Sequence, residues 1–149
     1  MATKKFMGID WKSEKGAATV LILSKNKKKF KIEKITYFKN KDLLKQSHAI
    51  SEHMRDNDVV QAVADIGFGA VQVQYLQKEC GDRVKSCYYA KNKDMIKYNT
   101  NNWMLTVDRD AFISEALEAI GYPFKTDTEL TKSEMHALNY AYIASCGVN

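Results

Sequence analysis

Proline is nearly absent from this sequence, and long apolar runs are missing altogether. One proline among 149 residues leaves almost every stretch free to form a helix or a strand. No run of 18 or more apolar residues occurs, which excludes a membrane-spanning helix. The first ten residues, MATKKFMGID, lack the apolar segment of a secretory signal peptide. We therefore expect a cytoplasmic protein with no membrane partner.

Cysteine is also scarce. Cys80, Cys87 and Cys146 are odd in number and include no CxxC pair, which argues against a disulfide framework and against a zinc site. We expect free, partly buried thiols. The length fits a single domain over residues 1–149.

Positive charge is abundant but unevenly spread. Residues 1–50 carry 13 lysines and four acidic residues, whereas residues 51–149 carry 10 basic and 14 acidic residues. This asymmetry indicates a polyanionic partner for one face, with a solvated lysine-rich surface as the alternative.

The hydrophobic pattern predicts a mixed-sheet α/β domain. Three strands come first and form an antiparallel meander, over residues 5–10, 17–25 and 30–39. Helices are predicted over residues 42–58, 68–81, 108–121 and 130–147, and further strands over residues 59–67, 83–90 and 103–107. Strands that alternate with helices after a meander favour a sheet with both parallel and antiparallel pairs.

Two aspartates stand at the ends of predicted strands. Asp10 ends the run KKFMGID, and Asp65 ends the run VVQAVAD. If these strands are neighbours, both carboxylates lie at one edge of the sheet, where repulsion and loss of water are costly. Mg²⁺ removes this cost, because it binds one or two carboxylates and leaves positions for water and phosphate oxygens. The pattern therefore predicts one or two divalent ions placed for phosphodiester hydrolysis.

Each aspartate alone has a simpler explanation. Asp10 would cap a turn, and Asp65 would cap the helix that follows it. Their matching positions, with a lysine-rich hairpin expected nearby, favour the metal site.

Four segments follow one another in an order typical of one nuclease family. GIDW resembles its first catalytic strand, and VADIGFGAVQVQYLQKECGDRVKSCYYAKN resembles its second motif. LTVDRDAFISEALEAI resembles the strand and long helix that come next, and SEMHALNYAYIA resembles the final helix. Together they resemble the ribonuclease H-like (RuvC-like) nuclease domain of tailed-phage terminase large subunits. The resemblance implies a ribonuclease H-like mixed sheet flanked by helices.

The resemblance also implies an activity and a site. The activity is a divalent-metal-dependent endonuclease, using Mg²⁺ or Mn²⁺, that cuts concatemeric viral duplex DNA during genome packaging in the host cytoplasm. It assigns Asp10 and Asp65 as metal ligands. The third ligand of the family precedes Ala-Leu on the final helix, and His136 stands there in place of the usual aspartate. An imidazole suits Mn²⁺ better than Mg²⁺.

Other residues compete for the third position. His136 also fits a histidine at an interface between elements. Glu134 is the second candidate, although it lies about 200° from His136 around a helix and forms a predicted T-x-x-E capping box with Thr131. Asp108, Asp110 and Asp127 are further candidates, and Asp108 equally fits a helix cap.

Lysines supply predicted contacts to the DNA backbone. Lys12 and Lys15 follow Asp10 and could approach the scissile phosphate. Five more surround the loop between the second and third strands: Lys25, Lys27, Lys28, Lys29 and Lys31. The alternative for these five is a solvated turn with edge lysines that discourage aggregation.

A phosphate loop of the form GxxxxGK[ST] is absent, so the motif of the packaging ATPase of full terminase large subunits is missing. We expect the nuclease part alone, either from a longer protein or as a separate polypeptide. The implied partners are duplex DNA, the packaging ATPase, the small terminase subunit and the portal. Two alternatives stay open: a Holliday-junction resolvase or ribonuclease H on the same fold, and a catalytically weak DNA-binding or assembly module.

Overall fold

The first three strands form the predicted antiparallel meander. In the computed structural model, which describes residues 3–90, 96–121 and 130–147, these strands are β1 (Lys4–Trp11), β2 (Ala17–Asn26) and β3 (Lys29–Lys39). β2 is almost entirely buried because it lies between β1 and β3 and has helices on both faces. Gly16 makes the turn before β2 with a φ of 76°, in the left-handed region that glycine adopts without strain.

Parallel strands extend this meander into a seven-stranded sheet. β4 (Val59–Asp65) pairs parallel with β1, β5 (Val84–Tyr89) with β4, and β7 (Met104–Val107) with β5. The described strands follow the order β3-β2-β1-β4-β5-β7-β6. The outermost strand, β6 (Ile96–Asn99), was not predicted, because its four residues alternate between half-buried and exposed within a polar stretch.

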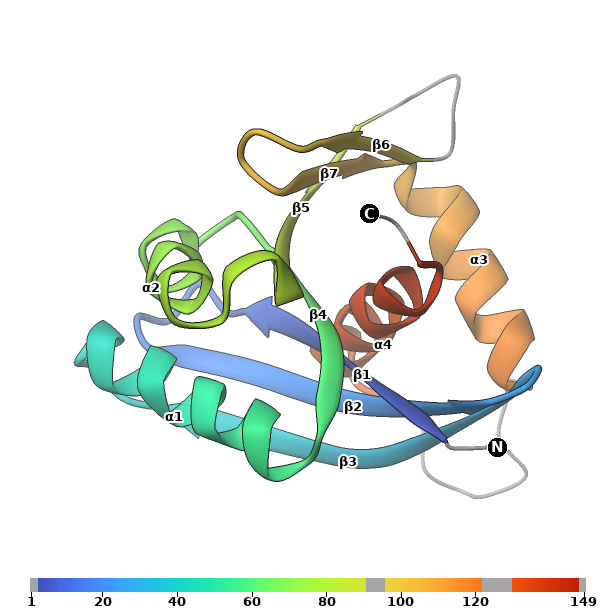
Figure 1. Ribbon diagram of the computed structural model, residues 1–149, viewed down its shortest axis with the longest axis horizontal. Coiled ribbons are helices and arrows are strands. Elements are labelled where there is room, and N and C mark those ends of the chain that lie inside the picture. The colour runs from blue at the N-terminus through green and yellow to red at the C-terminus, as the bar shows by residue number, and fades with distance from the viewer. Residues whose placement is uncertain (1–2, 91–95, 122–129, 148–149) are drawn as a thin grey trace.

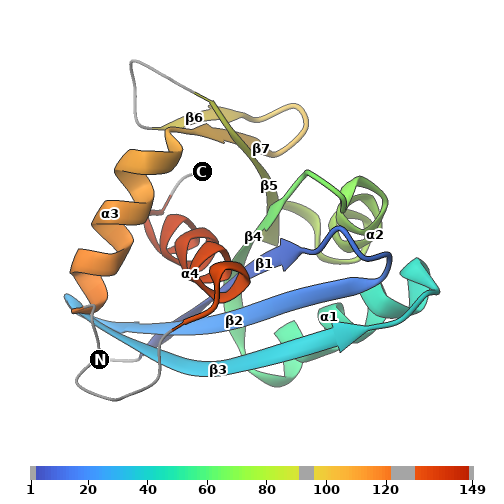
Figure 2. The same ribbon diagram turned by 180° about the vertical axis from the view of Figure 1, so that it is seen from behind.

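Helices cover both faces of the sheet (Figure 1, Figure 2). α1 (Leu43–Asp56) and α2 (Ala70–Cys80) pack on one face, and a 3₁₀ turn, η1 (Gly81–Arg83), follows α2. α3 (Arg109–Ile120) and α4 (Lys132–Ser145) pack on the other. In the described parts of the chain, no helix combines the length and apolar character needed to cross a membrane.

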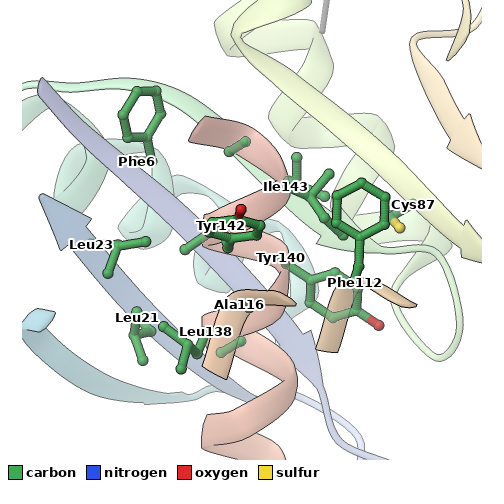
Figure 3. Packing of buried hydrophobic residues seen from close by; sticks show 14 of the residues in the cluster. Phe6, Leu21, Leu23, Cys87, Phe112, Ala116, Leu138, Tyr140, Tyr142 and Ile143 are labelled. Atoms are coloured by element: carbon green, nitrogen blue, oxygen red, sulfur yellow. The ribbon is translucent and has the colours of Figure 1, made fainter. Parts of the chain in front are cut away.

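Side chains of β1 alternate between two hydrophobic cores. Met7, Ile9 and Trp11 belong to the core beneath α1 and α2. Phe6 belongs to the core beneath α3 and α4, where Figure 3 shows residues from β2, α3 and α4 gathered together. The period of two therefore turns Asp10 toward α4.

α4 lies unusually close to β1. An ideal Cβ built on Gly8 would lie 1.9 Å from the carbonyl oxygen of Ala137 and 2.5 Å from the backbone nitrogen of Ala141. Only a residue without a side chain permits this approach, which brings the first turn of α4 to the end of β1 that carries Asp10.

Candidate active site

Asp10 and Asp65 occupy equivalent positions on neighbouring parallel strands. Ile9 pairs with Ala64, so the two aspartates are the next opposed residues at the carboxyl ends of β1 and β4. Adjacent strands are separated by about 5 Å, and both side chains point toward α4. The neighbour relation that the sequence analysis assumed is confirmed.

The two aspartates belong to a row of residues that crosses the sheet. Asp10 pairs with Thr19 on β2, Thr19 pairs with Tyr37 on β3, and Asp65 pairs with Cys87 on β5. The first turn of α4 lies over this row, because Ser133 and Glu134 both bond to members of it. Polar side chains from four strands and one helix therefore meet at one edge, with the buried thiol of Cys87 on β5 next to Asp65.

Each carboxylate has one oxygen held by a hydrogen bond. Ser133 Oγ donates to Asp10 Oδ2 at 2.7 Å, and the backbone N–H of Gly67 donates to Asp65 Oδ1 at 3.2 Å. Among the described residues, no other group bonds to either carboxylate with ordinary hydrogen-bond geometry, although the backbone N–H of Ile66 lies near enough to Asp65 to lower its pKa slightly. The pair thus offers one open oxygen from each side chain.

Burial makes the ionised pair unfavourable. It raises the pKa of Asp10, an effect that the Ser133 hydrogen bond and the charges of His136, Lys12 and Lys132 partly offset. It also raises the pKa of Asp65, and the neighbouring charge of Asp10 raises it further. A cation between the two carboxylates would relieve both effects.

His136 lies close enough to Asp10 for the two side chains to interact electrostatically. Burial lowers the pKa of its imidazole, and Asp10 opposes this shift only in part, so the ring is neutral at pH 7. Its Nδ1 is buried and has no hydrogen-bond partner among the described residues. The ring of Tyr89 is 6.3 Å away, and burial raises the pKa of Tyr89 to about 12, which gives His136 an uncharged neighbour.

Glu134 is engaged elsewhere. It completes the predicted capping box, in which the Thr131 side chain accepts from the Glu134 N–H and the Thr131 N–H donates to Glu134 Oε1 at 2.8 Å. Its other oxygen accepts a hydrogen bond from the Tyr37 hydroxyl. Both carboxylate oxygens of Glu134 therefore accept hydrogen bonds that hold the start of α4 in place. The role of Glu134 as a metal ligand stays an untested prediction.

The donor set suits a cation held mainly by two carboxylates. Within the described residues, no group of three His, Cys, Asp or Glu side chains is close enough to hold a metal ion. Mg²⁺ binds by one or two carboxylates and takes its other ligands from water and phosphate, so Asp10 and Asp65 fit it without a third side chain. His136 stays a predicted ligand that the structure does not bring into one cluster with both aspartates.

The loop after Asp65 is supported from the opposite face of the sheet. Trp11 packs so closely on Gly69 that a Cβ there would lie 1.9 Å from the indole Cδ1. Phe68 lies in this loop, between Asp65 and Gly69. Its side chain is 75% exposed and its φ is 59°, which is rare for a bulky residue. The structure thus holds an exposed aromatic ring three residues after Asp65.

The predicted DNA-binding lysines fall into two separate groups. Lys12 lies near Asp10, and the exposed Lys15 follows in the turn after β1. The loop between β2 and β3 lies at the other end of the sheet, because Lys25 pairs with Lys4 at the start of β1. Six residues of strand, about 20 Å, separate that end from Asp10.

The expected proximity of the basic hairpin to the aspartates is therefore wrong. The five hairpin lysines, Lys25, Lys27, Lys28, Lys29 and Lys31, do not belong to the site, although contact with DNA at a distance stays a prediction for them.

Two of the remaining acidic candidates belong to the start of α3. Asp108 caps α3, since its Oδ1 accepts from the Ala111 N–H at 3.2 Å, and Asp110 lies in the first turn of the same helix. Asp127 lies outside the described residues.

Three polar residues near Asp10 were missed by the sequence analysis. They are Thr19, Lys132 and Ser133. Ser133 precedes His136 by three residues and so shares its helical face, which is a signal that the sequence contained. Thr19 carried no local signal, because its importance depends on pairing with Asp10.

Solved structures that share this architecture include two DNA-processing proteins. T. thermophilus RuvC in complex with a Holliday junction substrate superposes with a TM-score of 0.53 and 12% identity, covering 97% of this chain and 96% of RuvC. The nuclease domain of the large terminase of bacteriophage SPP1, with bound Mn, gives a TM-score of 0.51 and 14% identity, covering 95% of this chain and 86% of that domain. No protein-family model and no curated protein sequence matches the chain. The likeness confirms the predicted ribonuclease H-like fold.

Proposed function

We propose that this protein is a divalent-metal-dependent endonuclease acting on DNA. The observation that carries the proposal is the pair Asp10 and Asp65, two partly buried carboxylates with raised pKa values at the carboxyl ends of adjacent parallel strands. Such a pair weakens the fold unless a cation binds it, which marks it as a functional feature. The neighbours RuvC and the SPP1 terminase domain supply an analogy on the same fold.

Residues at this edge of the sheet would bind the metal ion, bind the phosphate backbone and accept a proton. Asp10 and Asp65 would hold Mg²⁺ or Mn²⁺, and a bound divalent ion supplies charge stabilisation for hydrolysis of a phosphodiester. Lys12 and Lys132 would attract and orient the phosphate backbone near Asp10. His136, neutral at pH 7, would accept a proton or complete the ligand set.

We further propose the terminase role for this activity. The substrate would be concatemeric viral duplex DNA, cut when packaging begins and ends, in the cytoplasm of the infected cell. The partners would be the packaging ATPase, the small terminase subunit and the portal. The ordered sequence motifs and the likeness to the SPP1 domain support this reading.

Nicking of supercoiled plasmid tests the activity directly. We expect relaxation and linearisation in Mn²⁺ and less in Mg²⁺, because the imidazole of His136 suits Mn²⁺ better. We expect no cleavage in EDTA, because no divalent ion is then available to stabilise the charge that develops during phosphodiester hydrolysis. Intact plasmid in both metals, measured by gel electrophoresis with a folded sample, would favour the catalytically weak DNA-binding or assembly module.

A Holliday-junction resolvase is the second candidate. The exposed ring of Phe68 beside Asp65 favours it, because an exposed aromatic side chain can stack on an unpaired base. The same assay with a four-way junction and a matched linear duplex distinguishes the two. Preferential, symmetric cutting of the junction would support the resolvase, and equal or faster cutting of the duplex would support the packaging nuclease.

The two lysine groups should differ in their effect on cleavage. Lys12→Ala is expected to slow cleavage at saturating metal by about 10-fold, since a charge-assisted contact is worth about 1.5 kcal/mol. Lys28→Ala, at the far hairpin, should leave that rate unchanged and lower the salt slope of DNA binding by at most about 0.9. Equal rate losses in both variants would contradict the separation of the two groups.

A further inference from the structure

A chain of hydroxyl groups connects two strands and a helix beside Asp10. Ser133 Oγ on α4 lies 2.7 Å from Asp10 Oδ2 and 2.8 Å from Thr19 Oγ1 on β2. A serine hydroxyl has one hydrogen, and an ionised carboxylate can only accept. Ser133 must therefore donate to Asp10, and Thr19 must donate to Ser133. The chain runs in one direction, from Thr19 through Ser133 to Asp10.

We propose that Ser133 and Thr19 are positioning residues that fix the Asp10 carboxylate for metal binding. This inference rests on the proposed function. With Oδ2 held by Ser133, rotation of the carboxylate is restricted and Oδ1 is presented at the edge that Asp10 shares with Asp65. A ligand that is already fixed loses less conformational freedom when the cation binds, so affinity rises.

The surrounding structure makes this hydroxyl a rigid support. Thr19 is fully buried in the middle strand of the meander. Ser133 lies in the first turn of α4, which is fastened to β3 through Tyr37 and Glu134. Further along, α4 meets β1 at Gly8 with no room for movement toward the strand. Both ends of the hydroxyl chain are therefore anchored independently of the carboxylate.

A merely structural role predicts a different result. In that case the Ser133 bond would tie α4 to β1, and its loss would lower the melting temperature without changing the affinity for metal. The chain contains a matched control, because Ser24 Oγ donates to Glu33 Oε1 at 2.8 Å near the other end of β2. Ser24→Ala removes the same kind of bond far from the site.

Binding of Mn²⁺, followed by electron paramagnetic resonance on the full chain without DNA, tests the proposal. Ser133→Ala is expected to weaken Mn²⁺ binding by about 10- to 100-fold, the range typical of residues that orient metal ligands. Thr19→Val should weaken it by a smaller factor. Ser133→Thr and Thr19→Ser keep the hydroxyls and should bind like the parent, as should Ser24→Ala.

Plasmid nicking supplies the second readout. The Mn²⁺ concentration for half-maximal cleavage should rise in Ser133→Ala, while the rate at saturating Mn²⁺ should largely recover. If Ser133→Ala is folded and binds Mn²⁺ within twofold of the parent, the positioning role is wrong. If Ser133→Ala does not fold, unchanged Mn²⁺ binding by Thr19→Val overturns it instead. A parent protein that neither binds Mn²⁺ nor nicks DNA would contradict the proposed function itself.

Discussion

Replacing Asp65 with asparagine is expected to abolish metal-dependent DNA cleavage and to stabilise the protein at neutral pH. The activity should fall by more than about 100-fold. Mutating a residue that only orients a metal ligand costs up to about 100-fold, and losing a ligand itself should cost more. Asparagine keeps an oxygen for the Gly67 N–H, so the turn after β4 survives. What it removes is the negative charge that faces Asp10.

The gain in stability follows from the direction of the pKa shifts. Burial and the charge of Asp10 raise the pKa of Asp65 above its ordinary value of 3.8, so the folded protein binds this proton more tightly than the unfolded chain does. The ionised form therefore lowers the free energy of unfolding at pH values above the raised pKa. This cost disappears as the pH falls toward 3.8, the value for the unfolded chain.

Thermal unfolding at two pH values measures this. Without divalent metal, Asp65→Asn should melt at a higher temperature than the parent at pH 7 and at nearly the same temperature near pH 4. The exposed Asp110 on α3 provides the control: Asp110→Asn should not stabilise the protein, because an acidic residue in the first turn favours the helix. A lower melting temperature for Asp65→Asn at pH 7 would mean that this carboxylate supports the fold.

The sequence predicted the parts of the site that depend on local pattern. Asp10 and Asp65 each end an apolar run, and a run of that kind becomes a strand wherever it lies in the sheet. The capping box of Thr131 and Glu134 is equally local, since its partners are three residues apart. The predicted ends of these strands and helices also lie within a few residues of the observed ends.

Contacts between distant segments could not be predicted in this way. Ser133 is 123 residues from Asp10 and 114 residues from Thr19 in sequence. Their meeting depends on how α4 crosses the sheet, which no periodicity specifies. The bond between Tyr37 and Glu134 has the same origin. The polar surroundings of a predicted carboxylate are therefore the part that required the structure.

The misplaced hairpin is a different kind of error. In a meander, successive turns lie at opposite ends of the shared strand, here β2. Asp10 comes just before the first turn, so the second turn, with Lys27 and Lys28, had to lie at the far end. The predicted order of strands already contained this conclusion.

Gly8→Ala is expected to destabilise the protein strongly. The new Cβ would lie 1.9 Å from the Ala137 carbonyl oxygen and 2.5 Å from the Ala141 nitrogen, both backbone atoms of α4. A side chain could rotate away from such a contact, but a helix backbone must move as a whole. We expect a loss of about 3 kcal/mol or more, because α4 packs over the centre of the sheet.

Urea unfolding of Gly8→Ala measures this loss, with Gly67→Ala as the matched control. A Cβ on Gly67 would meet only the Asp65 carboxylate, at 3.4 Å, so its cost in stability should be small. If Gly8→Ala folds, α4 must have shifted away from β1, and Ser133 must have moved with it. Mn²⁺ binding should then weaken together with stability, whereas Gly67→Ala should keep its stability. Unchanged unfolding of Gly8→Ala would show that α4 does not approach β1 this closely, and the hydrogen bond from Ser133 to Asp10 would lose its structural basis.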